Sequence, residues 1–248
     1  MSSPIQVHLL PALIEPDALR DATAVVIDVL RATSTIVHAL AQGALGVIPC
    51  AGIDEAQRLA EQQLPGTALL AGERCGLPIP GFDLGNSPNE FSAQAVQGKK
   101  IFMTTTNGTR ALIAAKTARR VLVAALTNLS QVVVEARQQA GPVHLVCAGT
   151  DGRITLEDAL CAGGIARWLQ HFGDDMDASD DATQLAINLY ETHGPDYDRT
   201  FDLLRASRGG RNLIDCGLGD DISNCARQDR FDVVPELFVE DWEIRLAK

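Results

Sequence analysis

Short apolar segments rich in β-branched residues recur along the first two thirds of the chain, and a helix-forming segment follows most of them. Apolar runs bounded by glycine, proline or polar residues are typical of strands buried on both faces of a parallel sheet. The helical segments would form the crossovers between these strands. We expect strands at 24–30, 46–50, 68–71, 101–103, 119–126 and 143–149, and helices at 36–43, 54–63, 111–116, 130–139 and 155–170.

The last third of the chain has a different pattern, dominated by helical segments. An acidic segment at 173–181 is a connector or a helix start, and 207–211 is expected as a glycine–arginine turn. The apolar run 233–239 contains Pro235, which cannot donate to a strand ladder, so we expect an edge strand there. The helices expected in this region cover residues 182–193, 197–207 and 220–229.

Repeated alternation of strands and helices indicates an α/β fold with three layers, α/β/α, around a largely parallel or mixed sheet. No linker divides the chain, so we expect one domain over residues 1–248, built as one unit or as two α/β lobes with the site between them. Ligands of such folds bind at the carboxyl ends of the strands. The segment 72–88, with four glycines and three prolines, is expected to be a functional loop at that rim.

Composition excludes several classes of partner. A net charge of −11 without a Lys/Arg cluster makes nucleic acids and anionic membranes poor partners. No apolar run approaches the roughly 20 residues that span a bilayer, and no export signal is visible, so we expect a cytoplasmic protein. The six cysteines lack CxxC and zinc-finger spacing, which favours buried thiols. An anionic substrate would need local amides, arginines or a metal to reverse the overall field.

A polar turn separates the expected strand at 101–103 from the helix at 111–116. Such a turn directs backbone N–H groups and hydroxyls at one spot, where the helix dipole also favours negative charge. Glycine in the turn tolerates positive φ, and an arginine offers a bidentate group for oxyanions. The turn is either an anion cradle or an ordinary capped turn. Its candidate binding residues are Thr105, Thr106, Asn107, Gly108, Thr109 and Arg110.

Three acidic positions lie where apolar runs break: Asp28, Glu73 and the pair Glu157–Asp158. A carboxylate in apolar surroundings is costly unless a partner or a metal compensates it. Converging carboxylates and hydroxyls suit Mg²⁺, which takes oxygen ligands and keeps positions for water and phosphate. The alternatives are an ion pair of Asp28 with Arg31 or Arg74, and simple placement of the acidic pair at a helix start.

A cysteine mechanism is a competing hypothesis. Cys147 and Arg153 match the C-x5-R loop of cysteine-dependent phosphatases, at a strand end before a helix. Against this, Asp151 would place a negative charge in the loop, and Val146 replaces the histidine usual before the cysteine. The segment after Asp28 also lacks the second aspartate of the haloacid-dehalogenase phosphatases, and neither GxxxxGK[ST] nor GxGxxG occurs.

Four blocks together resemble the 2-phosphosulfolactate phosphatase family (ComB-like): VVIDVLRATSTI (25–36), GERCGLPIPGFDLGNSP (72–88), TTTNGTRAL (104–112) and VCAGTDGRITLEDALCAGGI (146–165). The resemblance extends to about residue 235. It implies a ComB-like α/β/α fold and a Mg²⁺-dependent phosphatase that hydrolyses (2R)-2-phospho-3-sulfolactate to (2R)-3-sulfolactate and phosphate. In methanogens this step belongs to coenzyme M synthesis.

The residues and the resemblance together give a working mechanism. Asp28, Glu73 and Asp158, together with Asp151, are expected to hold Mg²⁺, and the turn at 104–110 to hold phosphate oxygens. The other candidate substrate-binding residues are Arg31, Thr33, Ser34, Arg74, Asn86 and Ser87. The alternatives are a phosphatase of broader specificity and a non-catalytic binder of a sulfonated or phosphorylated metabolite. A homodimer is expected because it is the commonest oligomer.

Overall fold

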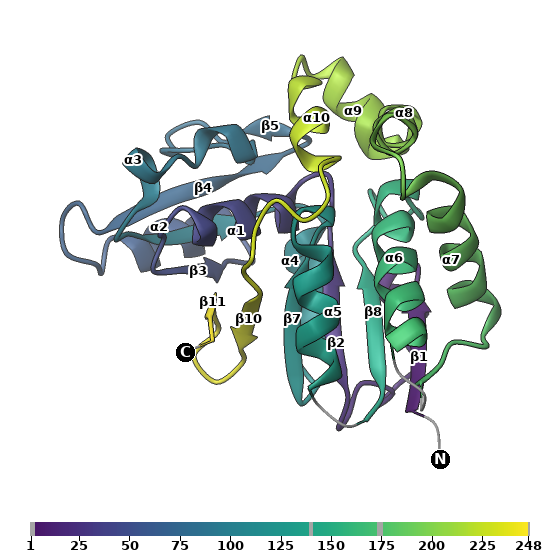
Figure 1. Cartoon of the computed structure of the whole chain (residues 1–248). Coiled ribbons are helices and arrows are strands. Elements are labelled where there is room, and N and C mark those ends of the chain that lie inside the picture. The colour runs from purple at the N-terminus through teal and green to yellow at the C-terminus, as the bar shows by residue number, and fades with distance from the viewer. Residues whose placement is uncertain (1–2, 139–140, 173–175, 248) are drawn as a thin grey trace.

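An 11-stranded mixed sheet runs through the computed structural model, which describes residues 3–138, 141–172 and 176–247 (Figure 1). Within these ranges the strands are β1 (Ser3–His8), β2 (Thr23–Ile27), β3 (Gly46–Pro49), β4 (Ala68–Arg74), β5 (Leu77–Pro78), β6 (Lys100–Thr104), β7 (Arg120–Ala124), β8 (Val143–Cys147), β9 (Met176–Asp177), β10 (Pro235–Phe238) and β11 (Glu243–Leu246). The helices are α1 (Ala32–Ala41), α2 (Ile53–Ala60), α3 (Ala93–Val96), α4 (Gly108–Ala115), α5 (Leu129–Arg137), α6 (Leu156–Phe172), α7 (Asp181–His193), α8 (Tyr197–Ala206), α9 (Arg208–Asp215) and α10 (Asp220–Cys225).

Two groups of parallel strands form the sheet, and an antiparallel hairpin joins them. One group is β4–β6–β3 and the other is β7–β2–β8–β1–β9. Between them lie β11 and β10, which pair antiparallel with each other and with β3 and β7. Figure 1 shows the first group lying crosswise to the second. The sheet is therefore mixed, with parallel strands on both sides of its centre.

Alternate residues of the central strands face opposite helical layers. In β2, Val25 packs in the cluster that includes α5, α6 and α7, whereas Val26 packs in the cluster that includes α1 and α4. The predicted three-layer α/β/α fold is thus confirmed. Ile27 at the end of β2 lies opposite Ala124 of β7 and Cys147 of β8. This register brings the carboxyl ends of three parallel strands to one level.

The strands and helices expected in the first two thirds are present, with boundaries that differ by a few residues. The largest difference lies at 24–43, where β2 ends at Ile27 and α1 begins at Ala32. The hydroxyl residues after Arg31 therefore form the first turn of the helix rather than a separate turn. Residue 139, the expected end of the helix at 130–139, lies outside the described residues.

Two expectations for the last third are wrong. The segment 207–211 is the start of α9 rather than a turn, because the Ser207 hydroxyl caps the helix by accepting from the Gly210 N–H at 3.0 Å. The strand β10 lies inside the sheet rather than at its edge. Pro235 is tolerated there because it is the first residue of the strand.

The remaining expectations for this region fare better. The helices at 182–193, 197–207 and 220–229 correspond to α7, α8 and α10. In the acidic segment 173–181, the first three residues lie outside the described part of the chain, and α7 begins at its last residue. The strands β1, β5, β9 and β11 were not predicted.

The helices α8, α9 and α10 form a separate group above one end of the β2–β8 strands (Figure 1). These helices follow α7 and precede β10 in the chain. After α10 the chain therefore returns to the centre of the sheet, where β10 lies. Among the described residues, none of the helices has the length and apolar character that crossing a bilayer requires.

Candidate active site

A cavity of about 350 Å³ lies where the carboxyl ends of β2, β4, β6 and β8 meet the helix α9. Asp28 follows β2, Glu73 is near the end of β4, and Thr105–Asn107 follow β6. Asp151 comes from the segment after β8, and Asn212 from α9. The structure therefore brings together residues from the four sequence blocks that carry the family resemblance.

The segment after β2 holds Asp28 through contacts of its own backbone. The Asp28 N–H donates to Thr33 Oγ1 at 2.9 Å, and Ser34 Oγ donates to the Val29 carbonyl at 2.7 Å. The Ala32 N–H lies 3.4 Å from Asp28 Oδ1. Thr33 and Ser34 thus stabilise the turn that presents the Asp28 carboxylate to the cavity, and neither lines the cavity itself.

Glu73 connects two loops of the cavity wall. Its Oε1 accepts the Thr106 N–H at 2.6 Å, and its Oε2 accepts the Gly76 N–H at 2.8 Å. The side chain is buried and lines the cavity. The carboxylate therefore fixes the β6–α4 turn relative to the start of the long loop.

The β6–α4 turn packs directly on the β2–α1 turn. A Cβ atom at Gly108 would lie 2.6 Å from Ala32 Cβ and 2.9 Å from Asp28 Oδ2, so this close approach requires glycine. In the same turn, the Thr109 N–H donates to Thr105 Oγ1 at 3.2 Å. Thr106 Oγ1 is buried and has no hydrogen-bond partner among the described residues. A buried hydroxyl without a protein partner is usually satisfied by a water, an ion or a ligand.

Two buried carboxylates, those of Glu157 and Asp158, lie in the first turn of α6. Asp158 accepts the Val29 N–H at 2.8 Å and the Gly149 N–H at 2.9 Å, so it joins the ends of β2 and β8. Burial raises the pKa of Asp158 to about 6 and that of Glu157 to about 8. Neither residue lines the cavity.

Negative charges crowd around Asp28. Burial raises the pKa of Asp28 well above its usual value, and the charges of Asp158 and Glu73 add to this effect. Neither arginine proposed as its partner is available for an ion pair. Arg31 binds Asp221, with a distance of 2.7 Å between Nη1 and Oδ2, and Arg74 donates to Thr104 Oγ1 at 2.8 Å. In the described part of the chain, then, the proposed ion pairs of Asp28 do not form, which leaves a site suited to a cation.

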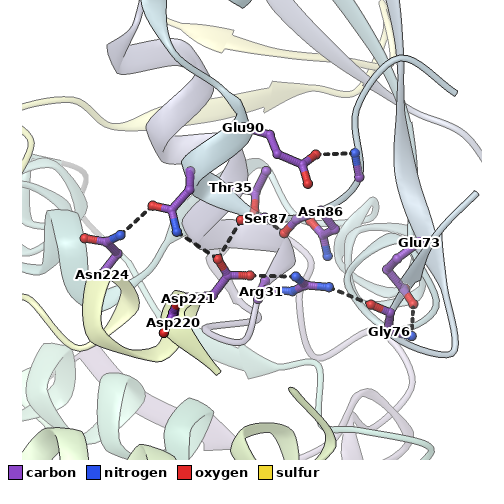
Figure 2. Close-up of polar contacts among 12 residues, drawn as sticks. Arg31, Thr35, Glu73, Gly76, Asn86, Ser87, Glu90, Asp220, Asp221 and Asn224 are labelled. Carbon is purple, nitrogen blue, oxygen red and sulfur yellow. Dashed lines mark hydrogen bonds and ion pairs between the residues drawn. The ribbon is translucent and has the colours of Figure 1, made fainter. Parts of the chain in front are cut away.

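Of four other predicted residues, Asn86 and Asp151 line the cavity, whereas Ser87 and Arg110 do not. Asn86 lines it, and its Oδ1 is buried without a partner among the described residues. Ser87 donates to Asp221, as Figure 2 shows. Arg110 is exposed on α4 and does not line the cavity. Asp151 is exposed at the rim and pairs with Arg208 at 3.2 Å.

The oxygen donors of the cavity fit Mg²⁺ better than a softer metal. Within the described ranges, no three His, Cys, Asp or Glu side chains lie close enough together to hold an ion by themselves. Magnesium is typically held by one or two carboxylates together with water and substrate phosphate. Asp28 and Glu73 line the cavity together with Thr106 and Asn86, whose side-chain oxygens have no partner in the described part of the chain, and these four form a donor set of that kind.

Cys147 is poorly placed for the competing cysteine mechanism. It is buried at the end of β8, and burial together with the charge of Asp158 raises its pKa well above the usual value. The nucleophile in such mechanisms is the thiolate, which this environment disfavours. Arg153, the other residue of the motif, is exposed to solvent.

Sequence reasoning missed the wall that the last third contributes. Gly209, Asn212, Asp215 and Cys216 line the cavity, and Asp221 of α10 binds Arg31 behind it. We expected a turn at 207–211, and therefore did not predict the helix α9, which carries most of these residues. Their helical spacing in the sequence gave no signal that they face residues near position 30.

A cavity at the carboxyl ends of parallel strands, lined by buried carboxylates and turn amides, is characteristic of α/β enzymes that act on small anionic molecules. The family model described as 2-phosphosulpholactate phosphatase matches residues 8–239 of this chain. The chain therefore belongs to the 2-phosphosulfolactate phosphatase family, whose members are phosphoric monoester hydrolases.

Several curated proteins are similar along nearly their whole length, and each is named probable 2-phosphosulfolactate phosphatase. The protein from Deinococcus radiodurans is 42% identical over 239 residues, which covers 96% of this chain and 94% of that protein. The protein from Caldanaerobacter subterraneus is 40% identical over 219 residues, covering 88% and 89%. The protein from Thermotoga maritima is 41% identical over 217 residues, covering 87% and 88%.

Proposed function

We propose that this protein is a Mg²⁺-dependent phosphatase that hydrolyses (2R)-2-phospho-3-sulfolactate to (2R)-3-sulfolactate and phosphate. The central observation is the contact between two strand-end turns, which places the buried Asp28 carboxylate against the polar β6–α4 turn in one cavity. The relatives from three bacteria, each named probable 2-phosphosulfolactate phosphatase, support this substrate.

The charges of the cavity support a requirement for a divalent cation. Its acidic lining residues are Asp28, Glu73, Asp151 and Asp215, whereas Arg31 is the one basic residue among the described lining residues and already pairs with an aspartate. A substrate with phosphate, sulfonate and carboxylate groups would be repelled by this lining. A bound cation would reverse the local field, as an acidic protein with an anionic substrate requires.

We assign the metal to Asp28 and Glu73, because both carboxylates are buried and face the cavity. Asp151 at the rim is a further candidate ligand. Asp158, whose two oxygens accept the Val29 and Gly149 amides, would act on the ion through water. When bound, Mg²⁺ would withdraw charge from a phosphoryl oxygen and lower the pKa of the attacking water.

The side chains of this protein would do the remaining work by binding and orienting the ester. The Thr106 hydroxyl and the residues beside it in the β6–α4 turn, which begins the helix α4, are proposed to hold phosphate oxygens. Asn86 and Arg31 also line the cavity, and the Asn86 side chain and the remaining donors of Arg31 are proposed to hold the sulfonate and carboxylate end. Glu73 positions the turn through the Thr106 amide.

Phosphate release from (2R)-2-phospho-3-sulfolactate tests the proposal directly. The expected result is turnover with Mg²⁺ that EDTA abolishes and added Mg²⁺ restores. Binding of the substrate without release of phosphate would favour a non-catalytic binder. Equal kcat/KM for 2-phospholactate, which lacks the sulfonate, would favour a phosphatase of broader specificity.

A further inference from the structure

Asp221 is a buried carboxylate of α10 that lies outside the cavity lining but contacts residues that form it. Its Oδ2 accepts from Arg31 Nη1 at 2.7 Å, across 190 positions of the sequence. Its Oδ1 accepts from Ser87 Oγ at 2.5 Å and from Asn89 Nδ2 at 3.0 Å. Figure 2 shows Arg31 of the β2–α1 turn and Ser87 of the loop 72–88 converging on Asp221.

The ion pair fixes the orientation of the Arg31 guanidinium. Both side chains are almost fully buried, with 3% and 4% of their surfaces exposed. A second group of the same guanidinium, Nη2, donates to the Gly76 carbonyl at 2.9 Å. Two of its nitrogens therefore have fixed partners, and the planar group can present its remaining N–H groups to the cavity in one orientation.

The contacts with Ser87 and Asn89 fix the loop that carries Asn86. On the other side of this residue, Thr35 Oγ1 donates to the Asn86 carbonyl at 2.9 Å. The backbone at Asn86 is thus held between α1 and the partners of Asp221. Its side-chain Oδ1 is left buried without a partner among the described residues, beside the cavity.

We propose that Asp221 is a positioning residue for phosphate ester hydrolysis, acting through Arg31 and through the loop at Asn86. It holds these two groups in the geometry that receives the substrate end remote from the phosphate, and it joins the α9–α10 segment to the strand-end turns. This inference rests on the proposed function, because the groups that it positions are those assigned to the substrate.

The test is the variant Asp221→Asn, which keeps the shape of the side chain and removes its charge. Misoriented binding groups are expected to lower kcat for phosphate release by about 10- to 100-fold. KM is not expected to rise, because the positive charge of Arg31 is then uncompensated and favours the anion. Asp221→Glu, which retains the charge, is expected to recover part of the lost kcat, and it serves as the test if Asp221→Asn does not fold.

A matched control is Ser223→Ala on the same helix. It removes the hydrogen bond from the Ser223 hydroxyl to the Asp220 carbonyl and leaves all three partners of Asp221 in place. Its melting temperature is expected to fall while kcat and KM stay at the wild-type values. In an Arg31→Met background, Asp221→Asn is expected to change kcat less than in the wild-type background, because the pair acts as a unit.

The outcomes separate this proposal from the proposed function. If wild-type protein releases no phosphate from (2R)-2-phospho-3-sulfolactate, the proposed function is wrong. If the wild type is active and Asp221→Asn loses thermal stability but keeps wild-type kcat and KM, Asp221 is structural and the positioning role is overturned. Equal effects of Asp221→Asn in the wild-type and Arg31→Met backgrounds would exclude action through Arg31.

Discussion

The β2–α1 and β6–α4 turns share a sequence pattern and both follow parallel strands, yet their hydroxyl groups have different partners. In the first turn, Thr33 and Ser34 bond to the backbone at Asp28 and Val29. In the second, the Thr106 hydroxyl has no hydrogen-bond partner within the described part of the chain. One turn therefore uses these hydroxyls to hold a carboxylate, and the other leaves one hydroxyl without a protein partner among the described residues.

This difference teaches that a polar turn cannot be assigned a role from its composition. The hydroxyls of Thr33 and Ser34 pair with the backbone groups of Asp28 and Val29. These groups are buried, and leaving them unpaired would be costly. In the β6–α4 turn the Thr105 hydroxyl accepts the Thr109 N–H, and Glu73 accepts the Thr106 amide from outside the turn. The Thr106 hydroxyl takes part in neither contact.

The largest effect is expected for Asp28→Asn. If this carboxylate is the principal metal ligand, phosphate release falls by roughly 10³-fold or more. The melting temperature should stay the same or rise, because the variant removes the charge that Asp158 and Glu73 repel. Turnover is measured by phosphate release, and folding by circular dichroism. Activity near the wild-type level would remove Asp28 from the metal site.

A matched pair of hydroxyl deletions compares the two turns directly. Thr106→Val is expected to lower kcat/KM by about 10- to 150-fold, since a hydrogen bond to a charged ligand is worth roughly 1.5–3 kcal/mol, with no loss of stability. Thr33→Val leaves the Asp28 N–H unpaired and is expected to lower the free energy of unfolding by about 1–3 kcal/mol with KM unchanged. Kinetics and urea denaturation of both variants check the contrast, and the reverse pattern would contradict it.

The pH dependence of stability extends the comparison to the third strand end, where α6 begins. Burial raises the pKa of Glu157 to about 8, from 4.5. The unfolded chain therefore loses this proton first, and the stability that protonated Glu157 provides is lost as the pH rises from about 4.5 to about 8. Without Mg²⁺, Glu157→Gln is expected to reduce the fall in the free energy of unfolding between pH 5 and pH 8 by about 1–3 kcal/mol. The measurement is a smaller fall in melting temperature over this pH range.

The control for this prediction is Glu61→Gln, which changes an exposed carboxylate at the end of α2. Its melting temperature should follow the wild-type curve at every pH. Parallel curves for Glu157→Gln and the wild type would show that Glu157 ionises normally in the folded protein.

The smallest effect is expected for Cys147→Ser, also at the third strand end. Because this thiol is buried and its raised pKa disfavours the thiolate, its removal should leave phosphate release and the sensitivity to EDTA unchanged. The cysteine mechanism would instead be supported if Cys147→Ser lost turnover with the fold intact and the wild-type protein stayed active in EDTA.

Much of the fold was predictable from local patterns. Buried parallel strands give continuous apolar runs, and the helices between them have their own periodicity, so the alternation was visible without tertiary information. The exceptions are instructive. The strands β1 and β11 are stabilised by pairing with β8 and β10, and β10, which begins at Pro235, lies inside the sheet because β7 and β11 pair with it on either side. Neither effect is local.

The sequence by itself determined the strand-end positions of Asp28 and Glu73 and the polar turn after β6, because each marks an abrupt end of an apolar run. Tertiary structure alone decided which polar groups face the cavity, and it supplied α9 and the Asp221 partner of Arg31. A buried charge must be paired or bound, but the chain can bring that partner from any distance. Local residue patterns carry no record of such a distant contact.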